Sequence, residues 1–249
     1  MAFSIYSRIP MPQISWKKEN MKLTLVFFHL VGGICFALGF LIYLFSLKFS
    51  LSPYMFSALI ILMSFFVTGG IHIDGFMDSC DGIFSRKPKE EALSIMQDSS
   101  CGAFAVIGAI LLFLAKLIFI GEIFKSDKFI FPFLFTFVFS RLLSGFSALH
   151  FKNAKNKGML FEASGEGINS KAQINLIIIF SLIWLSLSCL ADFLGTMILA
   201  LSLMLVYFIF KKTIIKNFGG ITGDLAGFLL EISEAFSFFA LAIAGGMLK

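Results

Sequence analysis

Three aspartates stand at helical spacing in the stretch GGIHIDGFMDSCDGIFSRK, residues 69–87. Asp74, Asp78 and Asp81 are spaced i, i+4 and i+7, which places them on one face of a helix. Carboxylate oxygens suit a hard divalent cation such as Mg²⁺, which prefers one or two carboxylates together with water and substrate phosphate. The spacing therefore predicts a Mg²⁺ site, and the alternative is a solvated acidic face at a helix end.

Two neighbouring residues extend this candidate site. His72 is either a ligand or proton carrier, or a hydrogen-bonded structural group. Asp98 opens the stretch DSSCGAF, residues 98–104, where it can begin the next helix or complete the metal site beside Asp81. Both alternatives are open for each residue.

A second polar segment, GGITGDLAGFLLEISEAF, covers residues 219–236. A glycine-rich helix start presents free backbone N–H groups, which suit phosphate. We therefore expect phosphate contacts from Gly220, Thr222, Gly223 and Asp224. Glu231 and Glu234 lie further along the same apolar segment, where they need partners. Lys116 and Arg141 are the two cations inside other apolar segments. The structural alternative to a contact with substrate is that these cations pair with the two glutamates. This alternative is favoured for Glu234.

The elements that position these residues are predicted to be membrane helices. The chain has 249 residues, of which 58% are hydrophobic and 14% charged, and its mean hydropathy is +0.93. This composition lies outside the range of soluble globular proteins. It predicts an all-α, polytopic membrane bundle with about seven spans (six to eight) in a single domain, residues 1–249. The seven candidate spans are Leu23–Leu47, Pro53–Ile73, Gly102–Phe124, Phe129–Phe151, Ile174–Ala191, Phe193–Phe210 and Leu225–Leu248.

The distribution of basic residues predicts the orientation. Fourteen of the 20 Lys and Arg residues lie in the N-terminal tail and the loops of its side, and four lie on the opposite side. Because cytoplasmic loops carry the excess of Lys and Arg, we expect a cytoplasmic N-terminal segment (residues 1–22), a cytoplasmic acid-rich loop (residues 74–101) and a C-terminus outside. The net charge of +5 is consistent with anionic lipid and gives no reason to expect nucleic acid as a partner. No signal peptide and no disulfides are expected.

The quoted motifs resemble the cobalamin synthase family, the adenosylcobinamide-GDP ribazoletransferases. The resemblance rests on GGIHIDGFMDSCDGIFSR, ALSIMQDSSCGAF and GGITGDLAGFLLEISE, and extends to SRIPMP (residues 7–12), Lys116 and the Ser140-Arg141 pair. It implies a Mg²⁺-dependent enzyme of the bacterial cytoplasmic (inner) membrane whose active site faces the cytoplasm. The implied reaction is the attack of the 3′-hydroxyl of α-ribazole, or of its 5′-phosphate, on the cobinamide phosphate of adenosylcobinamide-GDP, with release of GMP.

For such a reaction, phosphoryl transfer depends mainly on positioning and on neutralisation of charge. Asp74, Asp78, Asp81 and Asp98 would hold Mg²⁺, and one carboxylate or His72 would accept the proton of the hydroxyl. Glu231 is open between a contact with substrate and a structural pair. The cations expected to contact phosphate oxygens are Arg8, Arg86, Lys116 and Arg141.

Two other readings compete with this one. A CDP-alcohol phosphotransferase also places aspartates and glycines at cytoplasmic helix ends. That class has an Ala-Arg pair shortly after its Asp-Gly, whereas Asp74-Gly75 is followed by Phe76, Met77 and Asp78 and has no such pair. A transporter with gating carboxylates would place its acids near the middle of the membrane, whereas these gather at one surface. A homo-oligomer, or an assembly with other proteins of cobalamin synthesis, is left open.

Overall fold

The computed structural model describes residues 1–12, 21, 23–154, 160 and 168–248. These residues form helices and no strand; Asn153 and Ile221 make an isolated parallel β-bridge. The helices, in chain order, are α1 (Ala2–Tyr6), α3 (His29–Lys48), α4 (Pro53–Thr68), α5 (Ile71–Phe84), α6 (Lys89–Ile95), α7 (Ala103–Ser126), α8 (Ile130–His150), α10 (Ile168–Ala191), α11 (Phe193–Phe210), a π-helical turn (Lys211–Ile215), α12 (Lys216–Phe218) and α13 (Gly223–Met247).

The predicted membrane bundle is confirmed. Six helical segments of the described chain are long and apolar enough to cross a bilayer, and the bent pair α4–α5 would make a seventh span. The fifth and sixth predicted spans are separate helices, α10 and α11, because Asp192 caps α11: its Oδ1 accepts a hydrogen bond from the Gly195 amide at 2.8 Å. The protein is therefore a multi-pass membrane protein.

Three predicted boundaries were wrong. The first span begins at His29 and not at Leu23, and α10 begins at Ile168 and not at Ile174. The span predicted as Pro53–Ile73 ends at Thr68, where the chain turns by 94° into α5. The predicted loop of residues 74–101 consequently contains most of α5 and all of α6.

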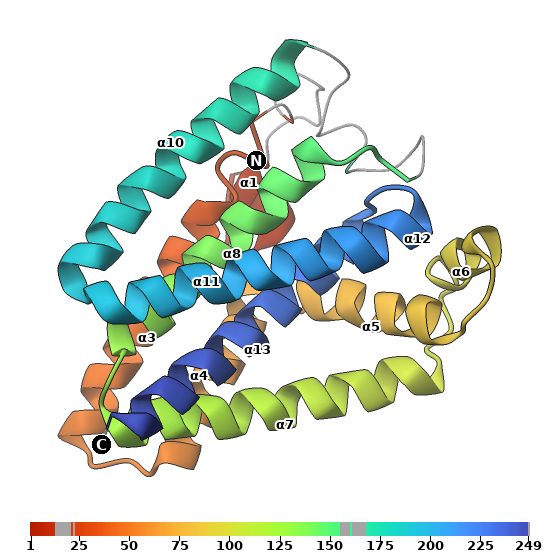
Figure 1. The fold of residues 1–249 in the computed structure, drawn as a ribbon. Coiled ribbons are helices and arrows are strands. Elements are labelled where there is room, and N and C mark those ends of the chain that lie inside the picture. Colours follow the sequence, from red (N-terminus) through yellow and green to blue (C-terminus); the bar gives the residue numbers. More distant parts are fainter. Residues whose placement is uncertain (13–20, 22, 155–159, 161–167, 249) are drawn as a thin grey trace.

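The packing is organised around α8 and α13. α8 lies between α3, α10 and α13, and α13 also contacts α5, α7 and α11 (Figure 1). Phenylalanines fill the contact of α4, α8 and α13, where Phe56, Phe133, Phe137 and Phe238 are buried in one cluster. Large apolar side chains also cover the outside, among them Phe66 and Leu190, as expected for a lipid-facing surface.

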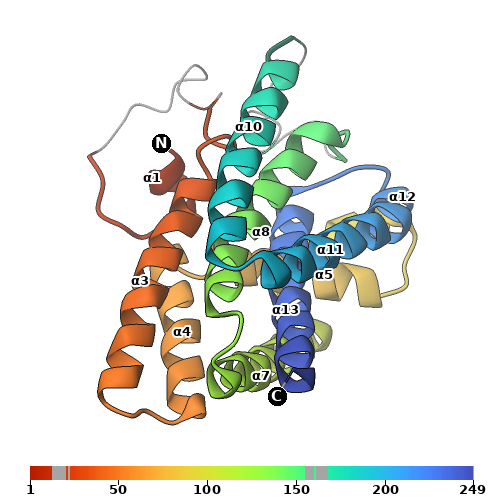
Figure 2. The same cartoon turned by 60° about the vertical axis from the view of Figure 1, so that its left-hand side comes forward.

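The loops gather at two ends of the bundle. Tyr43 at the end of α3 donates a hydrogen bond to Asp127 between α7 and α8 at 2.8 Å, and the Lys128 ammonium donates to the Leu248 carbonyl oxygen. The C-terminus therefore lies with the α3–α4 and α7–α8 turns, and Figure 2 shows it far from the N-terminus. At the other end, the bridge between Asn153 and Ile221 joins the segment after α8 to the start of α13.

Candidate active site

The bend between α4 and α5 sets the direction of the helix that carries Asp74, Asp78 and Asp81. Gly69 and Gly70 have φ angles of 66° and 79°, a left-handed conformation that side chains other than glycine rarely adopt. Two such residues in succession end α4 and start α5 in a new direction. The Arg8 side chain lies against Gly69, where an added Cβ would be 2.4 Å from its Cγ, and the Arg8 amide donates to the Val67 carbonyl oxygen at 2.8 Å.

Glycines then allow α5 and α13 to cross closely. A Cβ at Gly75 would lie 3.0 Å from the Cα of Asp224, and a Cβ at Gly227 would lie 3.1 Å from the His72 carbonyl oxygen. The crossing brings together Asp74 and Asp224, which are far apart in the sequence. Both line a cavity of about 170 Å³, the smaller cavity, whose lining residues are Tyr6, Leu25, Phe28, Ile71, His72, Asp74, Gly75, Ser144, Ala148, Leu160, Gly223, Asp224, Ala226 and Gly227.

A larger cavity, of about 570 Å³, lies on the other side of Asp74. It is lined by the N-terminal segment, the end of α4 and the first turns of α5. Arg8 and Asp74 both line it, and Ile71 and Asp74 line both cavities. The structure thus places Arg8 and Asp74 of the predicted site at the larger cavity. Asp74 lies at the junction of the larger and the smaller cavity.

Asp81 faces a different neighbour. The side chain is buried, and its two oxygens accept hydrogen bonds from the backbone amides of Gly102 at 2.7 Å and Ala105 at 2.9 Å. These amides are at the start of α7, so Asp81 caps that helix from another element. Asp78, one turn after Asp74, is half-buried and has an interaction partner.

Asp98 does not begin α7, contrary to one of the two roles expected for it. The N-cap residue of α7 is Gly102, and the capping carboxylate is that of Asp81. Asp98 is exposed and accepts a hydrogen bond from the Ser100 amide at 2.8 Å, which lowers the pKa of its carboxyl. Its role as a metal ligand stays a prediction.

The residues between α12 and α13 are used in local structure. Gly220 is buried against the segment after α8, where a Cβ would lie 2.3 Å from the Lys152 carbonyl oxygen. Thr222 caps α13 by accepting a hydrogen bond from the Leu225 amide at 3.1 Å. Gly223 is exposed and no atom lies within 4 Å of a Cβ placed there. The open approach to this helix start is therefore at Gly223 and Asp224.

The buried charges of the bundle neutralise one another. Lys116 of α7 contacts Glu231 at 2.5 Å and Glu234 at 2.8 Å, both on α13. Arg141 of α8 contacts the second oxygen of Glu234 at 3.1 Å and donates to the Phe137 carbonyl oxygen at 2.7 Å. Two cations and two carboxylates are balanced here, so the ion pairs expected under the structural alternative are present. Contacts of Lys116, Arg141 and Glu231 with the substrate stay a prediction.

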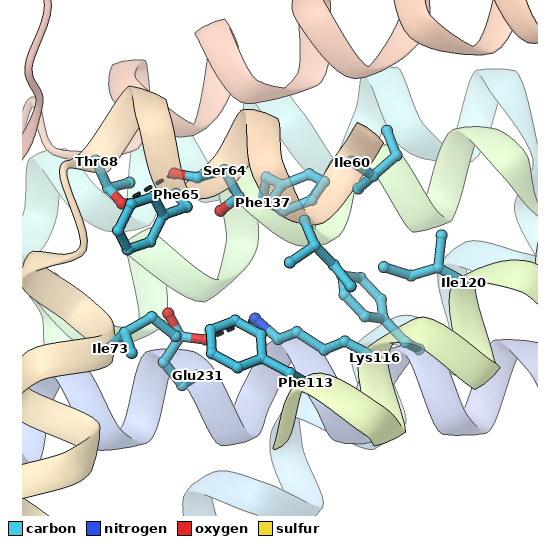
Figure 3. A pocket seen from close by; sticks show the side chains of 12 residues that line it. Ile60, Ser64, Phe65, Thr68, Ile73, Phe113, Lys116, Ile120, Phe137 and Glu231 are labelled. Carbon is cyan, nitrogen blue, oxygen red and sulfur yellow. Dashed lines mark hydrogen bonds and ion pairs between the residues drawn. The ribbon is translucent and has the colours of Figure 1, made fainter. Parts of the chain in front are cut away.

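A third cavity, of only about 20 Å³ and separate from the smaller and the larger cavity described above, lies beside the Lys116–Glu231 pair. Figure 3 shows Ser64, Thr68 and Glu231 around it, with the hydrocarbon part of Lys116 running along Phe113 and Ile120. The volume is enough for about one water molecule. This space is too small for a phosphate or a sugar, and the ion-pair network beside it joins α7, α8 and α13.

Arg86 lies apart from both cavities. It is exposed in the turn after α5 and has a φ of 54°. Neither the smaller nor the larger cavity includes it among its lining residues. Its contact with phosphate stays a prediction.

The carboxylates near the smaller cavity would bind a metal ion together with water and substrate phosphate as further ligands. Among the described residues, no three His, Cys, Asp or Glu side chains are grouped as a metal site. Mg²⁺ is commonly bound by one or two carboxylates, with water and substrate phosphate as the other ligands. Asp74 and Asp224 at one cavity, with Asp78 a turn beyond Asp74, fit a cation that arrives with a phosphorylated substrate.

Sequence reasoning missed the aromatic residues of the smaller cavity. Tyr6 and Phe28 pack against each other and lie beside His72, with ring centroids 6.4 Å and 5.3 Å from the imidazole. Tyr6 ends α1 and Phe28 directly precedes α3, so both are far from His72 in the sequence. No spacing pattern links these two residues to α5. The nearest signal is the matched segment SRIPMP, which begins directly after Tyr6.

Comparisons with known proteins agree with these features. Residues 1–242 match the family described as Cobalamin-5-phosphate synthase. A protein of Lachnoclostridium phytofermentans named adenosylcobinamide-GDP ribazoletransferase is 31% identical over 248 residues, which cover 100% of this chain and 94% of that protein. A protein of the same name from Clostridium botulinum (strain Alaska E43) is 32% identical over 243 residues, which cover 98% of this chain and 96% of that protein. One from Treponema denticola is 31% identical over 248 residues, which cover 94% of this chain and 93% of that protein. No solved structure matches the chain.

Proposed function

The chain belongs to the cobalamin-5-phosphate synthase family, and from this premise we propose the substrates, the site and the metal of its reaction. As a member of that family it is a membrane-bound transferase of cobalamin synthesis, with the ribazole transfer for which its relatives are named. The acceptor is α-ribazole or its 5′-phosphate, and the donor is adenosylcobinamide-GDP.

The reaction exchanges a phosphoanhydride bond for a phosphate ester bond. The 3′-hydroxyl oxygen of the acceptor forms a bond to the phosphorus attached to cobinamide. The bond from that phosphorus to the bridging oxygen of the diphosphate breaks, and GMP leaves with the electron pair. The proton of the hydroxyl goes to a carboxylate that lines the smaller cavity, Asp74 or Asp224. Asp74 is exposed and can pass the proton to water, whereas His72 is buried.

One observation carries this proposal: Asp74 lines both the hollow that contains Arg8 and the cavity that contains Asp224. Arg8 is a charge-assisted donor for phosphate oxygens of the diphosphate. Mg²⁺ would be held by Asp74, with Asp78 and Asp224 as further ligands, and when bound it supplies neutralisation of the diphosphate charge. Asp81 and Asp98 are the less favoured ligands, because Asp81 caps α7 and Asp98 lies on an exposed loop.

The orientation follows from the charge distribution. The two cavities lie at the end of the bundle where the N-terminal segment is found, and the loops of that end carry most of the Lys and Arg residues. We therefore place the site at the cytoplasmic face of the bacterial inner membrane, where GDP derivatives are available.

The test is a purified-enzyme assay with an Asp74→Asn variant. Protein in detergent, given adenosylcobinamide-GDP, α-ribazole 5′-phosphate and Mg²⁺, should release GMP and form the cobalamin product, and chelation of the metal should stop it. Asp74→Asn should lower kcat/KM by at least about 100-fold, the usual size of a lost general base or metal ligand.

The matched control is Asp127→Asn, the same substitution at the opposite end of the bundle, where Asp127 accepts the Tyr43 hydroxyl. An amide oxygen keeps that hydrogen bond, so activity should stay within twofold of wild type. Absence of GMP release by the wild-type protein would refute the proposed reaction. Equal activities of the two variants would refute the place of Asp74 in the site.

A further inference from the structure

The smaller cavity has the size and lining of a site for an aromatic ring system. Its volume of about 170 Å³ is close to that of an engineered apolar cavity of about 150 Å³ that accepts benzene. Tyr6, Leu25, Phe28, Ala148 and Leu160 supply most of the apolar lining. A diphosphate would leave its oxygens unsatisfied against these side chains.

His72 is the polar group within this aromatic surface. The residue is 6% exposed, and its imidazole lies beside the paired rings of Tyr6 and Phe28, whose centroids are 4.3 Å from each other and 6.4 Å and 5.3 Å from the imidazole. Its Nε2 atom is buried and has no hydrogen-bond partner among the described residues. Buried polar atoms in native proteins nearly always have a partner, so an unpaired one needs an explanation such as a ligand or a water molecule.

We propose that the smaller cavity binds the base of the acceptor nucleoside, and that the imidazole of His72 forms the hydrogen bond that recognises it. This inference rests on the proposed function, because it assigns a place to one of the two substrates. The base of ribazole is a dimethylated benzimidazole, an apolar bicyclic ring with one unsubstituted nitrogen that accepts a hydrogen bond. One acceptor on an otherwise apolar ring matches the unpaired nitrogen beside the apolar side chains of Tyr6, Leu25 and Phe28.

Guanine, the other base of the reaction, suits the cavity less well. Its edges carry several donors and acceptors, each of which needs a partner when buried. The Ser144 hydroxyl, another polar group of the lining, already donates to the Ala226 carbonyl oxygen at 3.0 Å. The guanine nucleotide therefore belongs with the larger, more polar hollow of about 570 Å³ around Arg8.

This division brings the substrates together at Asp74. With the base among Tyr6, Phe28 and His72, the ribose extends towards the carboxylates of Asp74 and Asp224 in the same cavity. The diphosphate of the donor lies by Arg8 in the adjoining hollow, which Asp74 also lines. His72 is thus a positioning and specificity residue, and the proton transfer stays with a carboxylate.

The test combines His72→Phe with substrate analogues. Phenylalanine keeps an aromatic ring beside Tyr6 and Phe28 and removes the nitrogen. The KM for α-ribazole should rise about tenfold, while kcat and the KM for adenosylcobinamide-GDP stay within about threefold; the tenfold figure is the usual size of one hydrogen bond. The control is His150→Phe, because His150 is an exposed residue at the end of α8 and should leave both KM values unchanged.

A second measurement separates recognition from mere structural support. The riboside of dimethylindole has a carbon in place of the accepting nitrogen. The wild-type enzyme should use it about tenfold less efficiently than α-ribazole, and His72→Phe should lose this discrimination. In direct binding, the same concentration of α-ribazole should raise the Tm of the wild-type protein more than that of His72→Phe. If His72→Phe does not fold, Ala148→Met, which fills the cavity, should weaken α-ribazole binding and spare the donor.

The outcomes are distinct. A kcat loss of more than 100-fold with unchanged KM values would make His72 the proton acceptor and overturn the inference. Equal discrimination between the two ribosides in wild type and His72→Phe would also overturn it, with the proposed reaction intact. If the wild-type protein releases no GMP, the proposed function fails and the inference fails with it.

Discussion

Asp74 and Asp81 stand two turns apart on α5 and have different surroundings. Asp74 is exposed at the junction of two cavities, whereas both oxygens of Asp81 accept backbone amides of α7. The sequence spacing alone makes the two equivalent. The tertiary structure separates them, because Gly102 leaves room for the carboxylate: a Cβ there would be 2.5 Å from an Asp81 oxygen.

The substitution Asp81→Asn should therefore act mainly on stability. Asparagine offers one carbonyl oxygen, so one of the two amides loses its acceptor and faces an NH₂ group. A buried donor left without a partner costs about 1–3 kcal/mol. Thermal unfolding in detergent should show a lower Tm for Asp81→Asn, while Asp74→Asn should unfold like the wild type.

Activity measured below the Tm provides the complementary readout. Asp81→Asn should keep turnover within about tenfold of wild type, because its carboxylate is engaged with α7. Loss of all turnover in a folded Asp81→Asn protein, with its Tm unchanged, would instead support the original expectation that Asp81 is a metal ligand.

At the scale of the elements, the site depends on glycines at two places: Gly69 and Gly70 directly before α5, and Gly75 within it. Gly69 and Gly70 create the bend of 94° that turns α5 away from the axis of α4. Gly75 then allows α13 to approach until the Cα of Asp224 is 3.0 Å from where a Cβ would be. Without both features, Asp74 and Asp224 would not line the same cavity.

Gly75→Ala should separate α5 from α13 and lower activity. The added methyl group meets backbone atoms of Asp224, which cannot rotate away as a side chain can. Overpacking of this kind typically costs about 1–3 kcal/mol. We expect a lower Tm and a fall in kcat/KM of at least about tenfold, because the two carboxylates move apart.

The control for this variant is Gly246→Ala. Gly246 is also helical, in α13, but no atom lies within 4 Å of an added Cβ. Alanine there should be neutral or stabilise by up to about 1 kcal/mol, because it favours helix more than glycine does. A Gly75→Ala protein as active and stable as Gly246→Ala would show that the close crossing is not required.

The elements also show how far the sequence could be read. Apolar length identified each long helix, and the predicted spans that end at Ala191 and begin at Phe193 match the boundary of α10 and α11. The bend at Gly69–Gly70 was missed, because an apolar run that continues to Ile73 looks like one span. The cap of α7 by Asp81 was missed for a different reason: it joins residues 21 and 24 positions apart, and no local pattern encodes that contact.

The whole molecule separates charge by location. In its interior, Lys116 and Arg141 are matched by Glu231 and Glu234, which join α7, α8 and α13 at little net charge. Removing one partner of such a group leaves an uncompensated buried charge, so these residues constrain helix packing. At the two ends, the chain instead shows a strong imbalance of Lys and Arg, which is the signal for membrane orientation.

That orientation can be tested with the cysteines of the chain. Cys101 is exposed in the loop between α6 and α7, whereas Cys35 and Cys80 are buried and Cys189 is half-buried. In a Cys189→Ser background, a membrane-impermeant maleimide applied to intact cells should not label Cys101, and permeabilised cells should show labelling. The reason is that Cys101 lies at the end that carries most of the Lys and Arg residues, which we place in the cytoplasm.

The same background supplies the opposite control. Lys125 lies near the α7–α8 turn, at the end where the C-terminus is found, and its side chain is 58% exposed. A Lys125→Cys substitution should therefore be labelled in intact cells. Labelling of Cys101 and protection of the cysteine at position 125 under these conditions would invert the orientation. Both cavities would then open to the outside, away from the cytoplasmic nucleotides that the reaction consumes, so the result would also contradict the proposed substrate supply.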